Sequence, residues 1–123
     1  MSKLKIVAID DEPDFIATLK DYFSLRGYDI DVALRGATGI ELVKDKKPNV
    51  VLMDLKMPGI DGDEVLKLIR SMNPSPKVIF ITAYDDGGKT RARLLDMGAY
   101  AYFDKPVVSL KLLEVAVNKA SQS

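Results

Sequence analysis

The stretch VVLMD, residues 50–54, decides the fold of this chain, because four apolar residues run without a break into an aspartate. Residues 5–11 (KIVAIDD) and 101–105 (AYFDK) have the same form, an apolar run that ends in charged residues. A continuous apolar run followed by a helical pattern is typical of a strand buried on both faces of a parallel sheet. Because parallel strands end at the same edge, the sequence predicts that these charged ends share one crevice.

Five predicted strands alternate with five segments of helical periodicity, and no repeat or linker interrupts them. Right-handed crossovers fold such a (βα)5 chain into a parallel sheet with helices on both faces. We expect an α/β fold with strand order 2-1-3-4-5, one of the common orders of doubly wound sheets. The strands are predicted at 4–9, 28–33, 50–53, 78–81 and 100–103, and the helices between 13 and 27, 37 and 46, 62 and 73, 85 and 97, and 108 and 119.

The composition indicates one soluble globular domain over residues 1–123, long enough to bury about two-thirds of its unfolded surface. Eighteen basic and eighteen acidic residues cancel, so no net charge draws the chain to nucleic acid or to a membrane. No apolar stretch approaches the roughly 20 residues that span a bilayer, and the start MSKLK lacks the apolar core of a signal peptide. With no cysteine, a cytoplasmic location is the default expectation. With no histidine, the commonest general base and zinc ligand are excluded.

The predicted crevice holds the carboxylates of Asp10, Asp11 and Asp54 together with the ammonium of Lys105. Like charges about 4 Å apart repel by roughly 4 kcal/mol at an effective dielectric constant of about 20. Crowded carboxylates therefore protonate, separate or bind a cation. A small site with oxygen ligands and several open positions suits Mg2+, which takes one or two protein carboxylates and keeps waters. In this interpretation Asp11 binds the metal directly and Asp10 binds it through water.

Asp54 is the candidate nucleophile, because a carboxylate can form an aspartyl phosphate and this one stands alone at the end of the central strand. Lys105 would neutralise the oxygens of the transferred phosphoryl group. Thr82, at the end of the fourth strand, offers a hydroxyl on the same edge of the sheet.

At these positions the chain resembles the receiver domain of two-component response regulators, which has a flavodoxin-like fold. The resemblance extends over essentially the whole chain, and although each motif is weak alone, their joint occurrence is highly specific. The matching residues are Asp10-Asp11, Asp54, Met57-Pro58-Gly59, Asp61-Gly62, Thr82-Ala83 and Lys105-Pro106.

The resemblance implies that Asp54 accepts a phosphoryl group from a partner's phosphohistidine and that Mg2+ is required. It implies further that the metal takes the backbone carbonyl of Lys56 and that the Lys105–Pro106 peptide bond is cis. Thr82 would move toward the phosphoryl group, and Tyr102 would fill the space that Thr82 leaves. That rearrangement would alter the face formed by the fourth helix, the fifth strand and the fifth helix, which is the usual output surface.

The same resemblance implies the partners. The phosphoryl donor would be a sensor histidine kinase or a histidine phosphotransfer protein, and the receiver of the signal would be a downstream target or an effector domain outside this sequence. The chain would be a monomer, or a dimer that forms through the output surface on phosphorylation.

Two side chains near the predicted site are not set by the family pattern. Lys56 follows Asp54 by two positions, and Tyr84 follows Thr82 by two. Neither is an obvious water-orienting acid or amide, and both are bulky enough to shield a phosphoryl group. We therefore expect slow self-dephosphorylation.

The same residues can be compared with the requirements of other classes of function. Residues 10–12 could simply cap a helix, and Asp54, Thr82, Lys105 and Tyr102 each have an ordinary structural interpretation. A haloacid-dehalogenase-like phosphatase needs a second acid where Lys56 stands, so no turnover of a separate substrate is expected. The chain lacks a P-loop, and its acidic first loop would repel a flavin phosphate. The alternative that stays open is a docking module of receiver fold that acts without phosphorylation.

Overall fold

Strands and helices alternate strictly in the computed structural model, which describes residues 4–123. The strands are β1 (Lys5–Ile9), β2 (Asp29–Ala33), β3 (Val50–Met53), β4 (Lys77–Thr82) and β5 (Ala101–Asp104). The helices are α1 (Pro13–Leu25), α2 (Gly36–Lys46), α3 (Gly62–Arg70), α4 (Lys89–Asp96) and α5 (Leu110–Ser121). The predicted sequence of elements is confirmed, and its boundaries differ from the observed ones by only a few residues.

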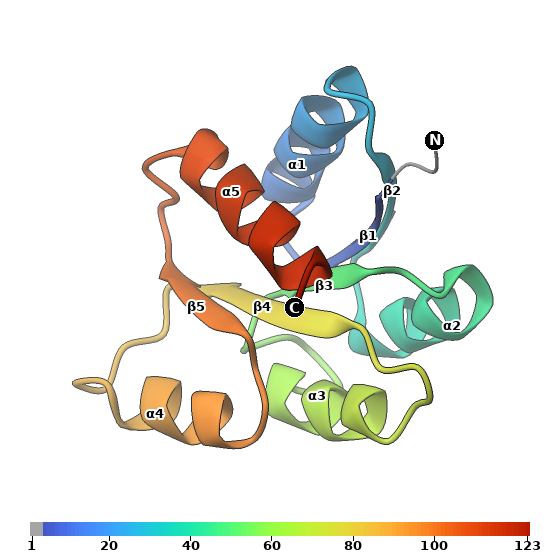
Figure 1. Cartoon of the computed structure of the whole chain (residues 1–123). Coiled ribbons are helices and arrows are strands. Elements are labelled where there is room, and N and C mark those ends of the chain that lie inside the picture. The colour runs from blue at the N-terminus through green and yellow to red at the C-terminus, as the bar shows by residue number, and fades with distance from the viewer. Residues whose placement is uncertain (1–3) are drawn as a thin grey trace.

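The strands are all parallel and form one sheet in the order β2-β1-β3-β4-β5, which confirms the predicted order. Helices α1 and α5 cover one face of this sheet, and α2, α3 and α4 cover the other (Figure 1). The result is a doubly wound, flavodoxin-like sandwich of three layers. Successive strands leave β1 in opposite directions, to β2 on one side and to β3 on the other, so the crevice of such a fold lies at the ends of β1 and β3.

The central strand β3 explains why the run VVLM is apolar throughout. Val51 and Met53 belong to the core beneath α2, α3 and α4, whereas Val50 and Leu52 belong to the core beneath α1 and α5. Each of the four is at most 1% exposed. Side chains alternate between the two faces of a strand, so a strand covered on both faces needs an apolar residue at every position.

The last helix begins at Leu110 rather than at residue 108 as expected. Ser109 is its N-cap, and the Ser109 hydroxyl accepts a hydrogen bond from the backbone N–H of Leu112 at 3.1 Å. The serine satisfies one of the N–H groups that every helix start leaves free, and so sets where the helix begins. No helix of residues 4–123 is both long and apolar enough to cross a membrane.

Candidate functional site

The ends of β1 and β3 bring two aspartates side by side. The register pairs Ile9 with Met53, so Asp10 and Asp54 follow at the same level of the sheet. The backbone N–H of Asp54 donates to the carbonyl of Ile9 at 3.0 Å, which extends the ladder to the site. Both aspartates are buried, with exposed fractions of 2% for Asp10 and 7% for Asp54. The sheet itself therefore positions two carboxylates that water can barely reach.

Lys105 reaches this site from the end of β5. Its Nζ lies 2.8 Å from Oδ2 of Asp10 and 3.4 Å from Oδ2 of Asp54, and it donates a hydrogen bond to Glu12. The backbone N–H of Lys105 donates to the carbonyl of Thr82 at 2.9 Å, and the Lys105–Pro106 peptide bond is cis. The structure thus brings three of the predicted site residues together, with one ammonium among three carboxylates.

The acidic group differs from the expected one by one residue. Carboxylate oxygens of Asp10, Glu12 and Asp54 lie within 4.8 Å of one another, and within residues 4–123 Asp11 does not belong to this group. The backbone N–H of Glu12 donates to Oδ1 of Asp10 at 3.0 Å. The chain therefore turns at Asp10, and Glu12, the N-cap residue of α1, rather than Asp11 extends its carboxylate to Lys105.

The residues of this group fit a small divalent cation. Oδ2 of Asp10 is buried, and the ammonium of Lys105 lies 2.8 Å from it. Three carboxylates whose oxygens lie within 4.8 Å of one another supply the oxygen ligands that Mg2+ prefers, and a single ammonium does not balance their charge.

The electrostatics of the site follow from its burial and its excess of acid. Burial raises the pKa of Asp10, and this effect outweighs the hydrogen bonds from Lys105 and from the N–H of Glu12. Burial lowers the pKa of Lys105, but hydrogen bonds to Asp10 and Glu12 and the charges of Asp10 and Asp54 outweigh it, so that the pKa is raised. Lys105 is therefore a permanent cation at neutral pH. One such cation leaves the acidic group with a surplus of negative charge.

The loop after β3 holds the Asp54 carboxylate in place. Oδ1 of Asp54 accepts a hydrogen bond from the N–H of Leu55 at 2.7 Å, and the carbonyl of Leu55 accepts one from the N–H of Gly62 at 2.7 Å. A Cβ atom on Gly62 would lie 2.5 Å from the carbonyl oxygen of Asp54 and 2.9 Å from the ring of Phe80. Only glycine fits at this approach of the two backbones, a requirement that the sequence alone does not reveal.

Thr82 and Tyr102 are linked through the backbone of Tyr84. The hydroxyl of Thr82, which is 2% exposed, accepts a hydrogen bond from the N–H of Tyr84 at 3.2 Å. The hydroxyl of Tyr102, which is 8% exposed, donates to the carbonyl of Tyr84 at 2.8 Å. The ring of Tyr102 therefore lies inward, and a shift of the segment after β4 would alter the surroundings of both side chains.

Lys56 and Tyr84 contact each other on the surface. The ammonium of Lys56 lies 4.9 Å from the centroid of the Tyr84 ring, within the range of a cation–π interaction. It also lies 4.0 Å from Oδ2 of Asp61. The two side chains that the sequence singled out beside the site thus form one cluster with Asp61.

Comparison with known proteins places this chain in a family. The family described as the response regulator receiver domain matches residues 6–117, so the chain belongs to the response-regulator receiver family. The solved receiver domain of the Francisella response regulator 1452 superposes with a TM-score of 0.88 at 28% identity, over 98% of each chain. A CheY-like receiver domain from Methanospirillum hungatei gives the same score and identity over 98% of this chain and 96% of its own.

Two curated relatives illustrate how differently this domain is used. Sporulation initiation phosphotransferase F of Bacillus subtilis is 32% identical over 86% of this chain and 85% of its own length. Regulatory protein AtoC of Escherichia coli is 37% identical over 96% of this chain, which spans only 25% of AtoC. The resemblance to two-component signalling proteins is therefore confirmed as family membership. Receiver domains are signalling domains, and these two relatives show one that makes up most of its protein and one that is a small part of a much longer protein.

Proposed function

We propose that this chain is a phosphorylation-activated switch in which Asp54 accepts a phosphoryl group from the phosphohistidine of a sensor kinase or phosphotransfer protein. The observation that carries the proposal is the position of the Asp54 carboxylate, 3.4 Å from Lys105 Nζ and next to the buried Asp10. An acid used only to cap a helix or a turn needs neither a lysine nor two further carboxylates around it.

The transfer step requires little covalent chemistry from the protein. An oxygen of the Asp54 carboxylate forms a bond to phosphorus while the bond between phosphorus and the imidazole nitrogen breaks, and that nitrogen keeps the electron pair. Lys105 donates hydrogen bonds to the equatorial oxygens, and its permanent charge stabilises them. The Leu55 N–H keeps the carboxylate in the same orientation throughout.

Asp10, Asp54 and the backbone carbonyl of Lys56 would hold Mg2+, together with Asp11 or Glu12. Bound Mg2+ would neutralise the excess acid and the phosphoryl oxygens. The placement of Glu12 in the acidic group makes it a candidate ligand beside Asp11, to which the sequence assigned the direct contact.

The signal would leave the site through Thr82 and Tyr102. A hydrogen bond from the Thr82 hydroxyl to the phosphoryl group would withdraw that hydroxyl from the N–H of Tyr84. The segment that carries Tyr84 also holds the Tyr102 hydroxyl, so the change reaches the face of α4, β5 and α5. A partner or a second copy that binds this face in one state only would convert the local change into an output.

The name of the sporulation phosphotransferase, of which the matched region is 85%, supports a role in a phosphorelay. AtoC, of which the matched region is 25%, supports a role as one domain of a longer regulator. The protein so described transmits a signal, in the cytoplasm, and turns over no substrate other than its own phosphoryl group. We propose a single receiver domain over residues 1–123, without direct contact with nucleic acid or membrane.

Incubation with acetyl phosphate and Mg2+ tests the assignment of Asp54. We expect intact-mass spectrometry to show the addition of one phosphoryl group, and Asp54→Asn to abolish it. Asp14→Asn removes an exposed acid from the first turn of α1 and serves as the matched control, with unchanged incorporation. Phosphorylation that survives Asp54→Asn at the normal rate would refute the proposal.

The Lys56–Tyr84 contact is proposed to prolong the phosphorylated state by shielding the site from water. Lys56→Asn and Tyr84→Ala are each expected to speed loss of the phosphoryl group severalfold, because a small side chain leaves room for an attacking water. Loss of label is followed after removal of acetyl phosphate. Loss within seconds in the unsubstituted protein, unchanged in both variants, contradicts this role.

A further inference from the structure

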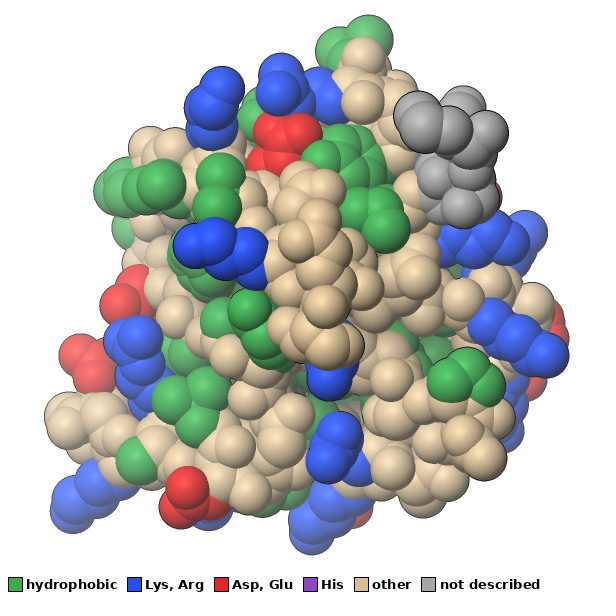
Figure 2. Space-filling model, viewed as in Figure 1, with side chains coloured by type: hydrophobic (Ala, Val, Ile, Leu, Met, Phe, Trp, Pro, Cys, Tyr) green, Lys and Arg blue, Asp and Glu red, His purple; other side chains and the backbone are tan. Residues whose placement is uncertain are grey.

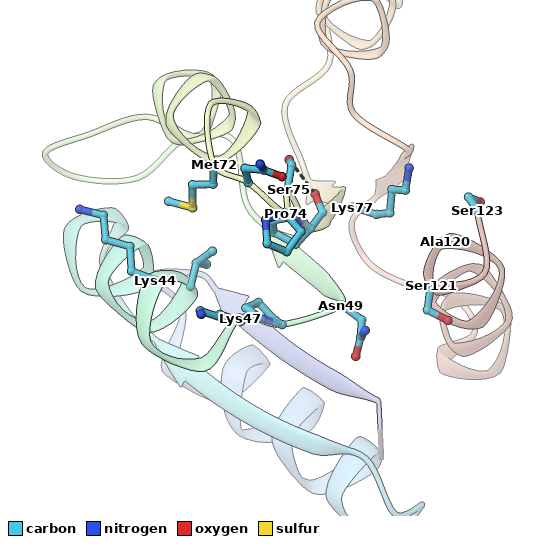
Figure 3. Close-up of a pocket in the computed structure, with 14 residues that line it drawn as sticks. Lys44, Lys47, Asn49, Met72, Pro74, Ser75, Lys77, Ala120, Ser121 and Ser123 are labelled. Carbon is cyan, nitrogen blue, oxygen red and sulfur yellow. Dashed lines mark hydrogen bonds between the residues drawn. The ribbon is translucent and has the colours of Figure 1, made fainter. Parts of the chain in front are cut away.

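A cavity of about 490 Å3 lies at the opposite end of the sheet from Asp54. The end of α2 and the segment between α3 and β4 form part of its wall, and the end of α5 forms the rest (Figure 3). Its volume lies within the range of about 300–1,000 Å3 that is usual for small-molecule sites. The signalling function described above uses none of the residues that line it.

The wall of this cavity is partly apolar. Pro48, Pro74 and Pro76 line it, together with Val43 and Met72. Each proline ring fixes its own φ and removes a backbone N–H donor. The wall offers apolar contact and little backbone hydrogen bonding. Recognition of a polar group must therefore come from side chains.

The charged side chains around the cavity are all lysines. Lys44, Lys47 and Lys77 line it, and no acidic residue does. Lys44 has a distant partner in Glu41, 3.7 Å away on the exposed side of α2, whereas Lys47 and Lys77 form no salt bridge within residues 4–123. Figure 2 shows Lys and Arg side chains spread over this whole view of the molecule, with some of them near its centre. The side chains that line the cavity therefore carry a net positive charge.

A structural role explains only some of these lysines. The carbonyl end of a helix carries partial negative charge, which Lys44 and Lys46 in the last turn of α2 already offset. Lys77 lies at the start of β4, across the cavity from α2 and on the side where α5 ends. Lys47 follows α2 with a left-handed φ of 49°, a position where glycine or asparagine is usual.

Asparagine adds a neutral donor to the same cavity. Oδ1 of Asn49 accepts the backbone N–H of Lys5 at 2.9 Å, which fixes the amide plane and leaves its NH2 group as a donor. Asn73 and Ser75 also line the wall. The donors thus outnumber the strong acceptors.

We propose that this cavity binds a small organic phosphomonoester, with its phosphate at the lysines and its apolar body against Met72 and the proline wall. A phosphomonoester carries about −1.5 to −2 charges at neutral pH, which suits several ammonium groups better than a single carboxylate does. Lysine binds phosphate as a point charge and needs no bidentate geometry. Methionine sulfur packs well against a flat ring. The site lies apart from the phosphoacceptor, and the proposal does not depend on the function of Asp54.

AMP tests this proposal, with adenosine and inorganic phosphate as its two halves. Each is titrated into the 15N-labelled full chain while backbone amide shifts are recorded. We expect saturable shifts with AMP at Lys47, Asn49 and Met72, and much weaker binding of either half. Asp54→Asn is expected to bind AMP with unchanged affinity, since the two sites lie at opposite ends of the sheet.

Substitutions distinguish specific binding of AMP in the cavity from nonspecific attraction of its phosphate to surface lysines. Lys47→Gln and Lys77→Gln should each weaken AMP binding about fivefold, the effect of losing about 1 kcal/mol of ion pairing. Lys46→Gln is the matched control, because it removes the same charge from the same helix end but does not line the cavity. Equal weakening by Lys46→Gln, equal affinity for inorganic phosphate or adenosine, or shifts that never saturate would each overturn the proposal.

Discussion

Two clusters of this molecule combine carboxylate with cation, and they are built in opposite ways. At the carboxyl ends of the strands, Asp10, Glu12 and Asp54 share the single ammonium of Lys105. Between α1, β2 and α5, the single carboxylate of Glu114 is surrounded by donors. Those donors are Arg26 at 2.7 Å, the Tyr22 hydroxyl at 2.9 Å and the Tyr28 hydroxyl at 2.8 Å.

The Glu114 cluster satisfies its charge completely, whereas the Asp10 cluster does not. Burial raises the pKa of Glu114, but the hydrogen bonds from Arg26, Tyr28 and Tyr22 outweigh it, so the pKa is lowered. For Asp10 burial outweighs the partners, and the pKa is raised. A carboxylate with enough donors holds a fold together, and a group of carboxylates with too few is poised to bind a cation.

Removing the Glu114 carboxylate should have the largest effect on stability. Glu114→Ala leaves Arg26 and two tyrosine hydroxyls without their shared acceptor, and we expect a loss of about 2–3 kcal/mol in the free energy of unfolding. Urea unfolding measures it. Glu41→Ala, which breaks the exposed pair with Lys44, should change stability by less than about 0.5 kcal/mol. Equal effects of the two substitutions would show that the Glu114 cluster is ordinary surface.

Neutralising an acid of the Asp10 cluster should raise the free energy of unfolding, whereas removal of Glu114 lowers it. The raised pKa of Asp10 means that folding disfavours its charged form, so Asp10→Asn should stabilise the metal-free protein at pH 7. The same substitution should abolish the gain in Tm that Mg2+ gives the unsubstituted protein. Glu114→Ala should keep that gain. If Asp10→Asn instead lowers the free energy of unfolding, the acidic group of Asp10, Glu12 and Asp54 has no excess of negative charge.

The contribution of Glu114 to stability should also depend on pH, and this effect is smaller than that of the substitutions above. Because the folded-state pKa of Glu114 is lowered, its contribution is present above its unfolded pKa and is lost as pH falls through the folded value. The stability difference between the unsubstituted protein and Glu114→Gln should therefore shrink as the pH is lowered from about 6 toward about 3. Unfolding titrations at several pH values measure it, and a constant difference would contradict the lowered pKa.

Much of the fold was predictable because its signals are local. Residues 50–53 are apolar at every position because β3 is covered on both faces. Parallel strands all end at the same edge of the sheet, and this places Asp54 and Lys105 together. The start of α5 was placed too early because Val108 continues the apolar pattern, while the Ser109 cap decides the boundary. The grouping of Glu12 with Asp10 and Asp54 is not visible in the sequence, since it depends on one hydrogen bond at Asp10, and the metal contact assigned to Asp11 stays a prediction.

The sequence by itself determined the alternation of elements, the family, and the edge at which Asp10, Asp54 and Lys105 meet. Only the tertiary structure showed the Glu114 cluster and the cavity of Lys47 and Lys77. Glu114 lies 92 positions from Tyr22 and 86 from Tyr28, and the cavity joins the ends of three separate helices. Apolar periodicity records which face of an element is buried, but not which polar side chains meet across two packed elements. Those contacts exist only after the core has set the distances between the helices.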